Sequence, residues 1–184
     1  MIFPAFRLLR RNPSIAALYG AIVAQARSPV FYRVYGVPDT IDGRFELIVL
    51  HTVLVFRRLA QDPRTRKFAQ GVFDQFCRDM DRNLRELGVG DLAVPRRMQE
   101  MGEAYYGRAG AYELALACGD TGMLVHALAK NIFSKPNDPP GGARRLAAYV
   151  TEAVRTLADR DDGDPNNPRL RFPDAESVIA VEAS

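Results

Sequence analysis

The chain has 184 residues, of which 47% are hydrophobic and 26% are charged, and its formal net charge is +3 at pH 7. This length and balance exclude a disordered or fibrous protein and fit one globular domain with a packed core. Two cysteines, Cys77 and Cys118, are too few for a disulfide framework, so we expect free thiols in a reducing compartment.

Charge is distributed unevenly along the chain. Residues 1–150 carry 21 basic and 14 acidic side chains, whereas residues 151–184 carry 4 and 8. A basic body could favour anionic lipid or ribosomal RNA, although 22 of the 25 basic residues are arginine, which genome composition alone can produce. Charge therefore contributes little to the functional interpretation.

Neither export nor a membrane span is expected. Residues 1–9 lack the basic-then-apolar order of a secretory signal. The arginines before Asp39 could suggest a mitochondrial leader, but a patterned helix already begins near Ser14 and leaves little room for one. The longest apolar run, residues 47–56, is far shorter than the roughly 20 residues that cross a bilayer.

The first predicted helix runs from about Ser14 to Arg27, because its apolar residues share one face and Asn12 or Ser14 can cap it. Pro29 then restarts the chain in a short aromatic turn or helix that ends at Gly36.

The segment 44–59 would also suit a buried strand, since two blocks of four apolar residues dominate it. However, Arg44, His51 and Arg58 recur every seven residues, and this spacing forms one stripe on a helix. We therefore expect a central helix that is nearly fully buried.

Four further helices follow from apolar spacings of three and four, at about 63–87, 94–116, 121–133 and 146–157. Asp91 is expected to cap the second of them, and residues 134–142 form an exposed loop. The sequence thus predicts an all-α fold, one globular domain of six to seven helices over residues 1–160. An irregular acidic tail, residues 161–184, is expected to be flexible or loosely docked and to be dispensable for folding.

The histidines are expected to be structural. His51 is flanked by apolar residues, and a lone histidine on a buried helix is usually a hydrogen-bonded core residue rather than a ligand. His126 lies on another predicted helix, and neither has a cysteine or carboxylate at metal-ligand spacing. We expect no metal and no cofactor.

The triplet Asp79-Met80-Asp81 resembles the paired acids that hold a metal with a nucleotide sugar, but Met80 belongs to the apolar stripe. The favoured interpretation is a solvated helix edge with the ion pairs Asp79–Arg82 and Asp81–Arg85. The chain also lacks a phosphate loop, a nucleophile elbow and a dinucleotide fingerprint, so nothing in it indicates an enzyme.

Several short sequence motifs, taken in order, are more informative than the spacing of apolar residues. They are residues 26–32 (ARSPVFY), 36–40 (GVPDT), 42–47 (DGRFEL), 84–91 (LRELGVGD) and 105–108 (YYGR). Together with His51 and Asp79-Met80-Asp81, this order resembles the ubiquinol-cytochrome c chaperone family, and the likeness covers roughly residues 15–130. The short length is more similar to the alphaproteobacterial members.

The resemblance implies a non-catalytic helical chaperone that binds newly made cytochrome b and assists assembly of the cytochrome bc complex, respiratory complex III. It implies work in the cytoplasm at the periphery of the inner membrane, rather than in a mitochondrial matrix. Mitochondrial relatives also use a second assembly factor at the ribosome, so those partners and a peripheral membrane contact are open here; DNA is not an expected partner.

An apolar client needs a shielded groove lined by adaptable side chains. We expect the client-binding residues to be Phe45, Met80, Met98, Met101, Tyr105 and Tyr106. The groove rim or family motif comprises Arg44, His51, Asp79, Asp81, Arg85, Glu86, Asp91 and Arg108.

Two rival functions stay open at this point. A small-molecule enzyme would need a concave pocket in which acids converge with His51. A nucleic-acid or ribosome-binding module would use the basic body and show strongly salt-dependent affinity.

Overall fold

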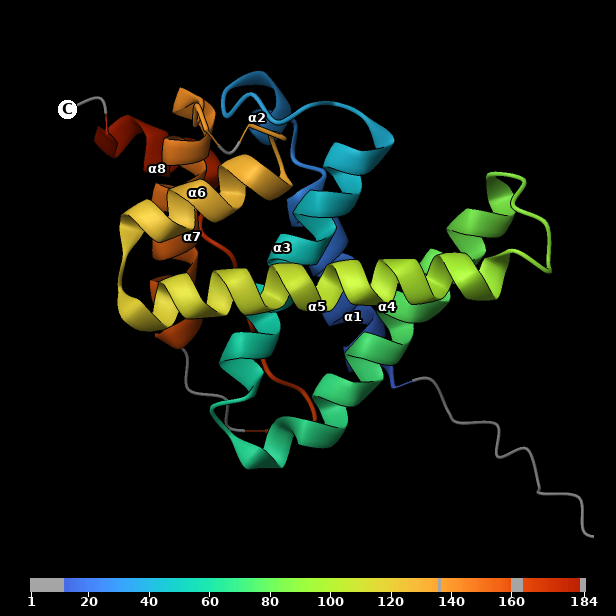
Figure 1. The fold of residues 1–184 in the computed structure, drawn as a ribbon. Coiled ribbons are helices and arrows are strands. Elements are labelled where there is room, and N and C mark those ends of the chain that lie inside the picture. The colour runs from blue at the N-terminus through green and yellow to red at the C-terminus, as the bar shows by residue number, and fades with distance from the viewer. Residues whose placement is uncertain (1–11, 136, 160–163, 183–184) are drawn as a thin grey trace, which may run out of the picture.

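The computed structural model describes residues 12–135, 137–159 and 164–182, with side chains up to residue 178. These residues form helices, turns and loops and contain no β-strand, which confirms the all-α prediction. Figure 1 shows the arrangement.

In chain order the helices are α1 (Pro13–Ala26), α2 (Pro29–Arg33), α3 (Ile41–Leu59), α4 (Arg66–Glu86), α5 (Val94–Cys118), α6 (Thr121–Asn131), α7 (Gly141–Ala158) and α8 (Ala175–Glu182), with a 3-10 turn, η1, at Pro63–Thr65. The expected six to seven helices correspond to α1 to α7. None of the described helices is long and apolar enough to cross a membrane.

Side-chain caps define several helix starts. The Asn12 carboxamide oxygen accepts the backbone N–H of Ser14, and the Thr40 hydroxyl accepts that of Gly43. The expectation that Asp91 caps α5 is wrong, because the residue before α5 is Ala93 and no side chain caps that end. Asp91 instead pairs with Arg85 across the turn between α4 and α5.

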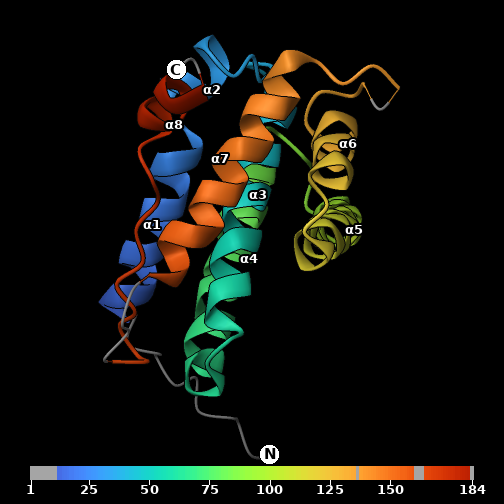
Figure 2. The same ribbon diagram turned by 90° about the vertical axis from the view of Figure 1, so that its left-hand side faces the viewer.

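Helix α3 is the centre of the fold, as expected. Residues 46–55 are all buried, and α3 packs against α1, α4, α5 and α7. Figure 2 shows α1 and α7 on one side of α3, with α5 and α6 on the other. The long helix α5 crosses one face of the molecule, and α6 joins it to α7.

Two glycines permit close contact with the α2–α3 connection. A Cβ atom on Gly43 would lie 2.0 Å from the carbonyl oxygen of Pro38, and one on Gly142 would lie 1.9 Å from that of Tyr35. Both contacts are with backbone, which cannot move aside cheaply, so larger residues would push α3 or α7 away from this connection.

His51 is a fully buried, hydrogen-bonded core residue, as the sequence predicts. Its Nδ1 lies 2.7 Å from the carbonyl oxygen of Leu47, which can only accept, so Nδ1 carries the proton. Its Nε2 therefore accepts from the Tyr149 hydroxyl at 2.9 Å, and that hydroxyl accepts from Gln25 at 3.0 Å. The chain of hydrogen bonds joins α1, α7 and α3.

Aromatic rings enclose this chain of hydrogen bonds. The Phe31 ring meets those of His51 and Tyr149 edge-on, with centroids 5.4 and 4.9 Å apart. The Phe172 ring, from the tail, lies 5.1 Å from His51. Burial lowers the pKa of His51 to about 4, so the ring is neutral at physiological pH.

The tail differs from the expected irregular segment. Residues 175–182 form α8, Leu170 and Ala175 are buried, and Phe172 packs on the core. The Tyr35 hydroxyl donates to the carbonyl of Ala175 at 2.8 Å. The sequence pattern did not predict this order, because the few apolar residues of the tail lie among helix-breaking and acidic residues.

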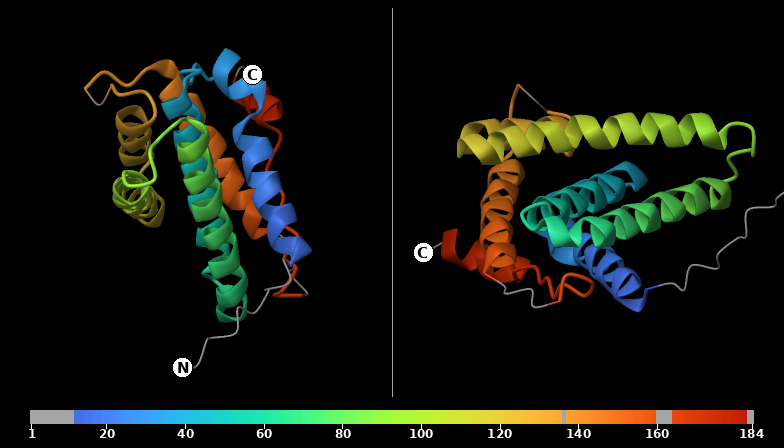
Figure 3. Two further views of the ribbon diagram at one scale, coloured as in Figure 1. Left: turned by 90° about the vertical axis from the view of Figure 1, so that its right-hand side faces the viewer. Right: turned by 90° about the horizontal axis from the view of Figure 1, so that it is seen from below.

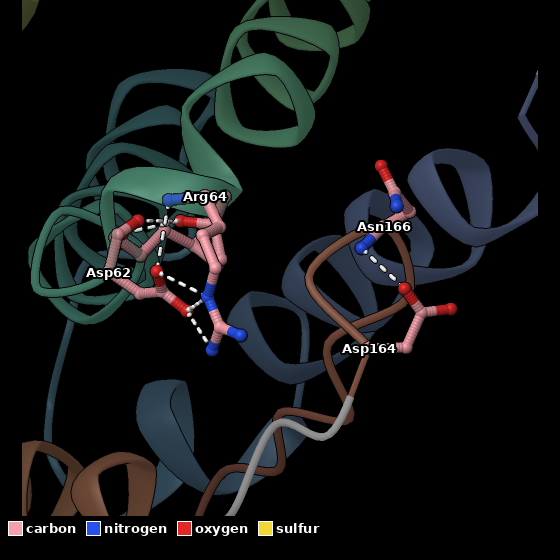
Figure 4. A network of polar contacts seen from close by, with 6 residues as sticks. Asp62, Arg64, Asp164 and Asn166 are labelled. Atoms are coloured by element: carbon pink, nitrogen blue, oxygen red, sulfur yellow. Dashed lines mark hydrogen bonds and ion pairs between the residues drawn. The ribbon is translucent and has the colours of Figure 1, made fainter.

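Short polar turns connect the elements at the end of the bundle where the tail begins. The Asp62 carboxylate accepts the backbone N–H of Arg64 at 2.9 Å and also pairs with its guanidinium. Asp164 accepts the backbone N–H of Asn166 in the same way, as Figure 4 shows. Both cysteines are free, as expected; Cys77 is half-buried and Cys118, at the end of α5, is exposed.

We predict that His51→Ala lowers the free energy of unfolding by about 1 to 3 kcal/mol at neutral pH, because it leaves the Tyr149 hydroxyl without its acceptor. It should also change the pH dependence. The unfolded chain binds a proton at His51 below about pH 6.5 but the folded chain only near pH 4, so wild-type stability falls across that window as pH drops.

Denaturant unfolding between pH 4 and 8 measures both effects. His126→Ala is the matched control, because His126 is exposed on α6 and its loss should leave stability at neutral pH unchanged. Equal pH dependence in wild type and His51→Ala would contradict the burial argument.

We predict that Phe172→Ala costs about 2 to 4 kcal/mol, because a half-buried ring leaves the aromatic cluster. Deleting residues 164–184 should cost at least as much while the circular-dichroism signal of a helical protein persists at low temperature. A deletion variant as stable as wild type would restore the expectation of a dispensable tail.

Candidate functional site

A cleft of about 870 Å³ lies where α3 begins and α4 ends. The helices run in opposite directions there, so the first turns of α3 face the last turns of α4. Helix α5 and the segment after α6 complete the walls.

Much of the lining is apolar. Phe45, Met80 and Met101, three of the expected client-binding residues, all line the cleft. Met80 is buried, whereas Phe45 and Met101 are half-buried. Ile41 and Leu87 line it as well and are 66% and 60% exposed, so apolar surface extends from the interior to the mouth.

An ion pair forms part of the wall. The Arg108 guanidinium, on α5, donates from Nε and Nη2 to the two carboxylate oxygens of Glu46 on α3. Arg108 also donates to the carbonyl of Ala104 at 3.0 Å. Burial raises the pKa of Glu46, and the neighbouring guanidinium opposes that effect. The pair fixes α5 against α3 and keeps a buried charge compensated.

Charged residues also border the mouth. Arg44 lines the cleft and pairs with Asp39 through Nε at 2.7 Å, and both side chains are more than half exposed. Glu86 lines it from the end of α4, and Arg27 from the end of α1. Arg44, Glu86 and Arg108, expected at the groove rim, are thus brought together.

Tyr105 and Tyr106 belong to a different hollow, of about 730 Å³, where α3 ends and α4 begins. Tyr105 is 5% exposed and its ring lies between those of Phe73, Phe76 and Tyr106. Burial raises the pKa of its hydroxyl. The single groove expected from the sequence is therefore two separate hollows, and Tyr105 is mainly a core residue.

The remaining expected site residues lie outside both hollows. Met98 is half-buried against the core, and His51 is enclosed by the aromatic cluster. Asp79 accepts the Tyr19 hydroxyl at 2.9 Å and pairs with Arg82, while Asp81 pairs with Arg85. Both predicted ion pairs are confirmed, although Asp79 is more enclosed than a solvated edge.

Sequence reasoning missed Glu46, Asn83, Leu84, Leu87, Ile41 and Asn131 as cleft-lining residues. One signal was available. Glu46 interrupts an apolar run on a helix predicted to be buried, and a buried carboxylate requires a partner. Its partner lies 62 positions away, so the sequence could not name it.

Glu46 on α3 and Glu86 on α4 both line the cleft, but His51, which an enzymatic site was expected to include, is buried elsewhere. Among the described residues no group of three or more histidine, cysteine or acidic side chains could hold a metal ion. The cleft is better suited to binding an apolar surface than to proton transfer.

Known proteins resemble this chain in sequence. An assembly factor 1 of the ubiquinol-cytochrome-c reductase complex from Xenopus laevis is 26% identical over 153 residues, covering 82% of this chain and 76% of the relative. The factor of the same name from Mus musculus is also 26% identical. The match covers 52% of the mouse protein and 51% of the human one, so the chain spans about half of these two relatives.

A solved structure agrees in fold. The crystal structure of the Cbp3 homolog from Brucella abortus superposes with a TM-score of 0.82 at 36% identity, covering 90% of this chain and 92% of that one. The sequence model of the ubiquinol-cytochrome C chaperone family matches residues 33–164. These residues include α3, α4, α5 and α6, which supply most of the cleft lining, and the chain belongs to the ubiquinol-cytochrome C chaperone family.

Proposed function

We propose that this chain is a non-catalytic assembly chaperone that binds newly made cytochrome b in the cleft between α3, α4 and α5. Its client then enters the cytochrome bc complex. Family membership supports a role in assembling that complex, and the cleft supports binding of an apolar segment.

The observation that carries the proposal is the apolar mouth of the cleft. Ile41 and Leu87 expose most of their side chains at the edge of a concave surface, an arrangement typical of a protein-binding groove. The methionines inside are flexible and polarizable, so they can adapt to irregular apolar side chains.

Two features of the cleft bear on how a client would bind and be released: a preformed wall and a charged rim. The Glu46–Arg108 pair holds α3 and α5 together, so the wall is present before a client arrives. Because an apolar mouth adds affinity while charged rim residues remain hydrated, binding should be reversible, as a chaperone requires. Since cytochrome b is a membrane protein, we propose that the chain works at the cytoplasmic periphery of the membrane.

We predict that Ile41→Asp combined with Met101→Ser reduces capture of newly made cytochrome b at least tenfold, because a charge then occupies the apolar mouth. Stability should change by less than about 2 kcal/mol, since Ile41 is mostly exposed and Met101 is half-buried. Pull-down from a strain lacking the native protein, with denaturant unfolding of the same preparation, measures both.

Met98→Ser is the matched control for Met101→Ser, because both methionines are half-buried on α5 and only Met101 lines the cleft. Tyr105→Ser serves as a stability control that should cost several kcal/mol by disrupting the aromatic packing. Normal capture and normal complex levels in the cleft variant would refute the cleft assignment.

A further inference from the structure

The turn between α4 and α5 projects from the body and carries apolar side chains at its tip. Leu92 is 100% exposed and Leu87 is 60% exposed. Figure 1 shows the connection extending beyond the other helices, and the second panel of Figure 3 shows the same from below. Gly88, at φ +83°, allows the sharp change of direction that presents these side chains.

Arginine side chains lie behind the apolar tip, in the adjoining ends of α4 and α5. Arg82 and Arg85 lie in the last turns of α4, and Arg96 and Arg97 lie in the first turn of α5. All four side chains are at least 47% exposed, and the first turn of α5 has no acidic residue.

Asp79, Asp81 and Glu100 lie further from the tip, whereas Glu86 and Asp91 lie beside the exposed leucines. Arg82 pairs with Asp79, and Arg96 and Arg97 pair with Glu100, whereas Arg85 pairs with Asp81 on α4 and with Asp91 at the tip. Between Arg82 and Arg97, four arginines face only two acids, Glu86 and Asp91. The segment therefore carries a net charge of +2 beside its two exposed leucines.

We propose that the α4–α5 tip is a lipid-binding element that inserts Leu87 and Leu92 into the headgroup region of an anionic bilayer. The arginines behind the tip then contact lipid phosphates. This inference deepens the proposed function, because it names the surface that holds the chain at the membrane.

A bilayer fits this tip better than a protein partner does. A stable protein interface covers roughly 800 Å² on each side with close complementarity, which a narrow convex turn cannot offer. A bilayer accepts a small apolar wedge from any direction and supplies phosphates around it. Leu87 also lines the cleft, so insertion of the tip would bring the mouth of the cleft to the membrane surface.

The native chain contains no tryptophan, so a single Leu92→Trp substitution provides an unambiguous reporter. With vesicles of phosphatidylglycerol and phosphatidylcholine, its emission should shift to shorter wavelength and be quenched by brominated acyl chains. Leu114→Trp is the control, because Leu114 is 56% exposed on α5, about 33 Å along the helix axis from the tip. Its emission should change little.

Loss of binding is tested with Leu87→Ser and Leu92→Ser together in the full chain, against Leu114→Ser. Co-sedimentation with the anionic vesicles should weaken roughly tenfold or more for the tip variant alone. Arg96→Gln with Arg97→Gln should reduce the preference for anionic over pure phosphatidylcholine vesicles. Thermal unfolding should be unchanged, since the four side chains are exposed.

Equal quenching at both tryptophans, vesicle binding that survives the serine substitutions, or no binding to either vesicle would overturn the proposal. A blue shift of Leu92→Trp that grows with protein concentration in the absence of lipid would assign the tip to a second copy instead. Met101→Ser separates the two proposals: it should keep full vesicle binding even if it loses client capture.

Discussion

Helix α3 has almost no face turned to water, and this burial constrains everything packed around it. A buried helix satisfies its own backbone groups, but each polar side chain on it needs a partner from another element or from its own preceding turn. Thr52 donates to the carbonyl of Ile48 at 2.7 Å, within α3 itself. Glu46 and His51 instead draw partners from α5 and α7, which fixes how those helices approach.

These two cross-helix contacts divide the molecule into a closed side and an open side. Around His51 the rings of Phe31, Tyr149 and Phe172 pack with centroids 5.4, 5.6 and 5.1 Å from that of the imidazole. Around Glu46, the side chain of Arg108 bridges α3 and α5, and the cleft lies beside this ion pair. The cleft therefore exists because a narrow ion pair, rather than layered rings, holds that end of α3.

Periodicity predicted most of the helices well because each of them buries a single face, whereas α3 is buried on almost all sides. The spacing of Arg44, His51 and Arg58 correctly identified a helix, yet these residues do not share one environment: Arg44 is exposed, Arg58 is half-buried and His51 is fully buried. Which parts of α3 are covered depends on helices up to 100 positions away, which a local pattern cannot report. The same limit explains Tyr105, whose i, i+4 relation to Met101 is real although the two side chains enter different hollows.

The aromatic packing around His51 thus lies at the middle of α3, and the cleft lies at its first turns. The apolar residues at the cleft mouth, Ile41 and Leu87, lie at helix ends where few neighbours restrain them, so they can move without loosening the core. The aromatic cluster at His51 carries the stability that permits this freedom. The hydrogen-bond chain from Gln25 through Tyr149 to His51 contains no residue that lines the cleft, so side chains at the mouth can change rotamer while α1, α3 and α7 keep these contacts.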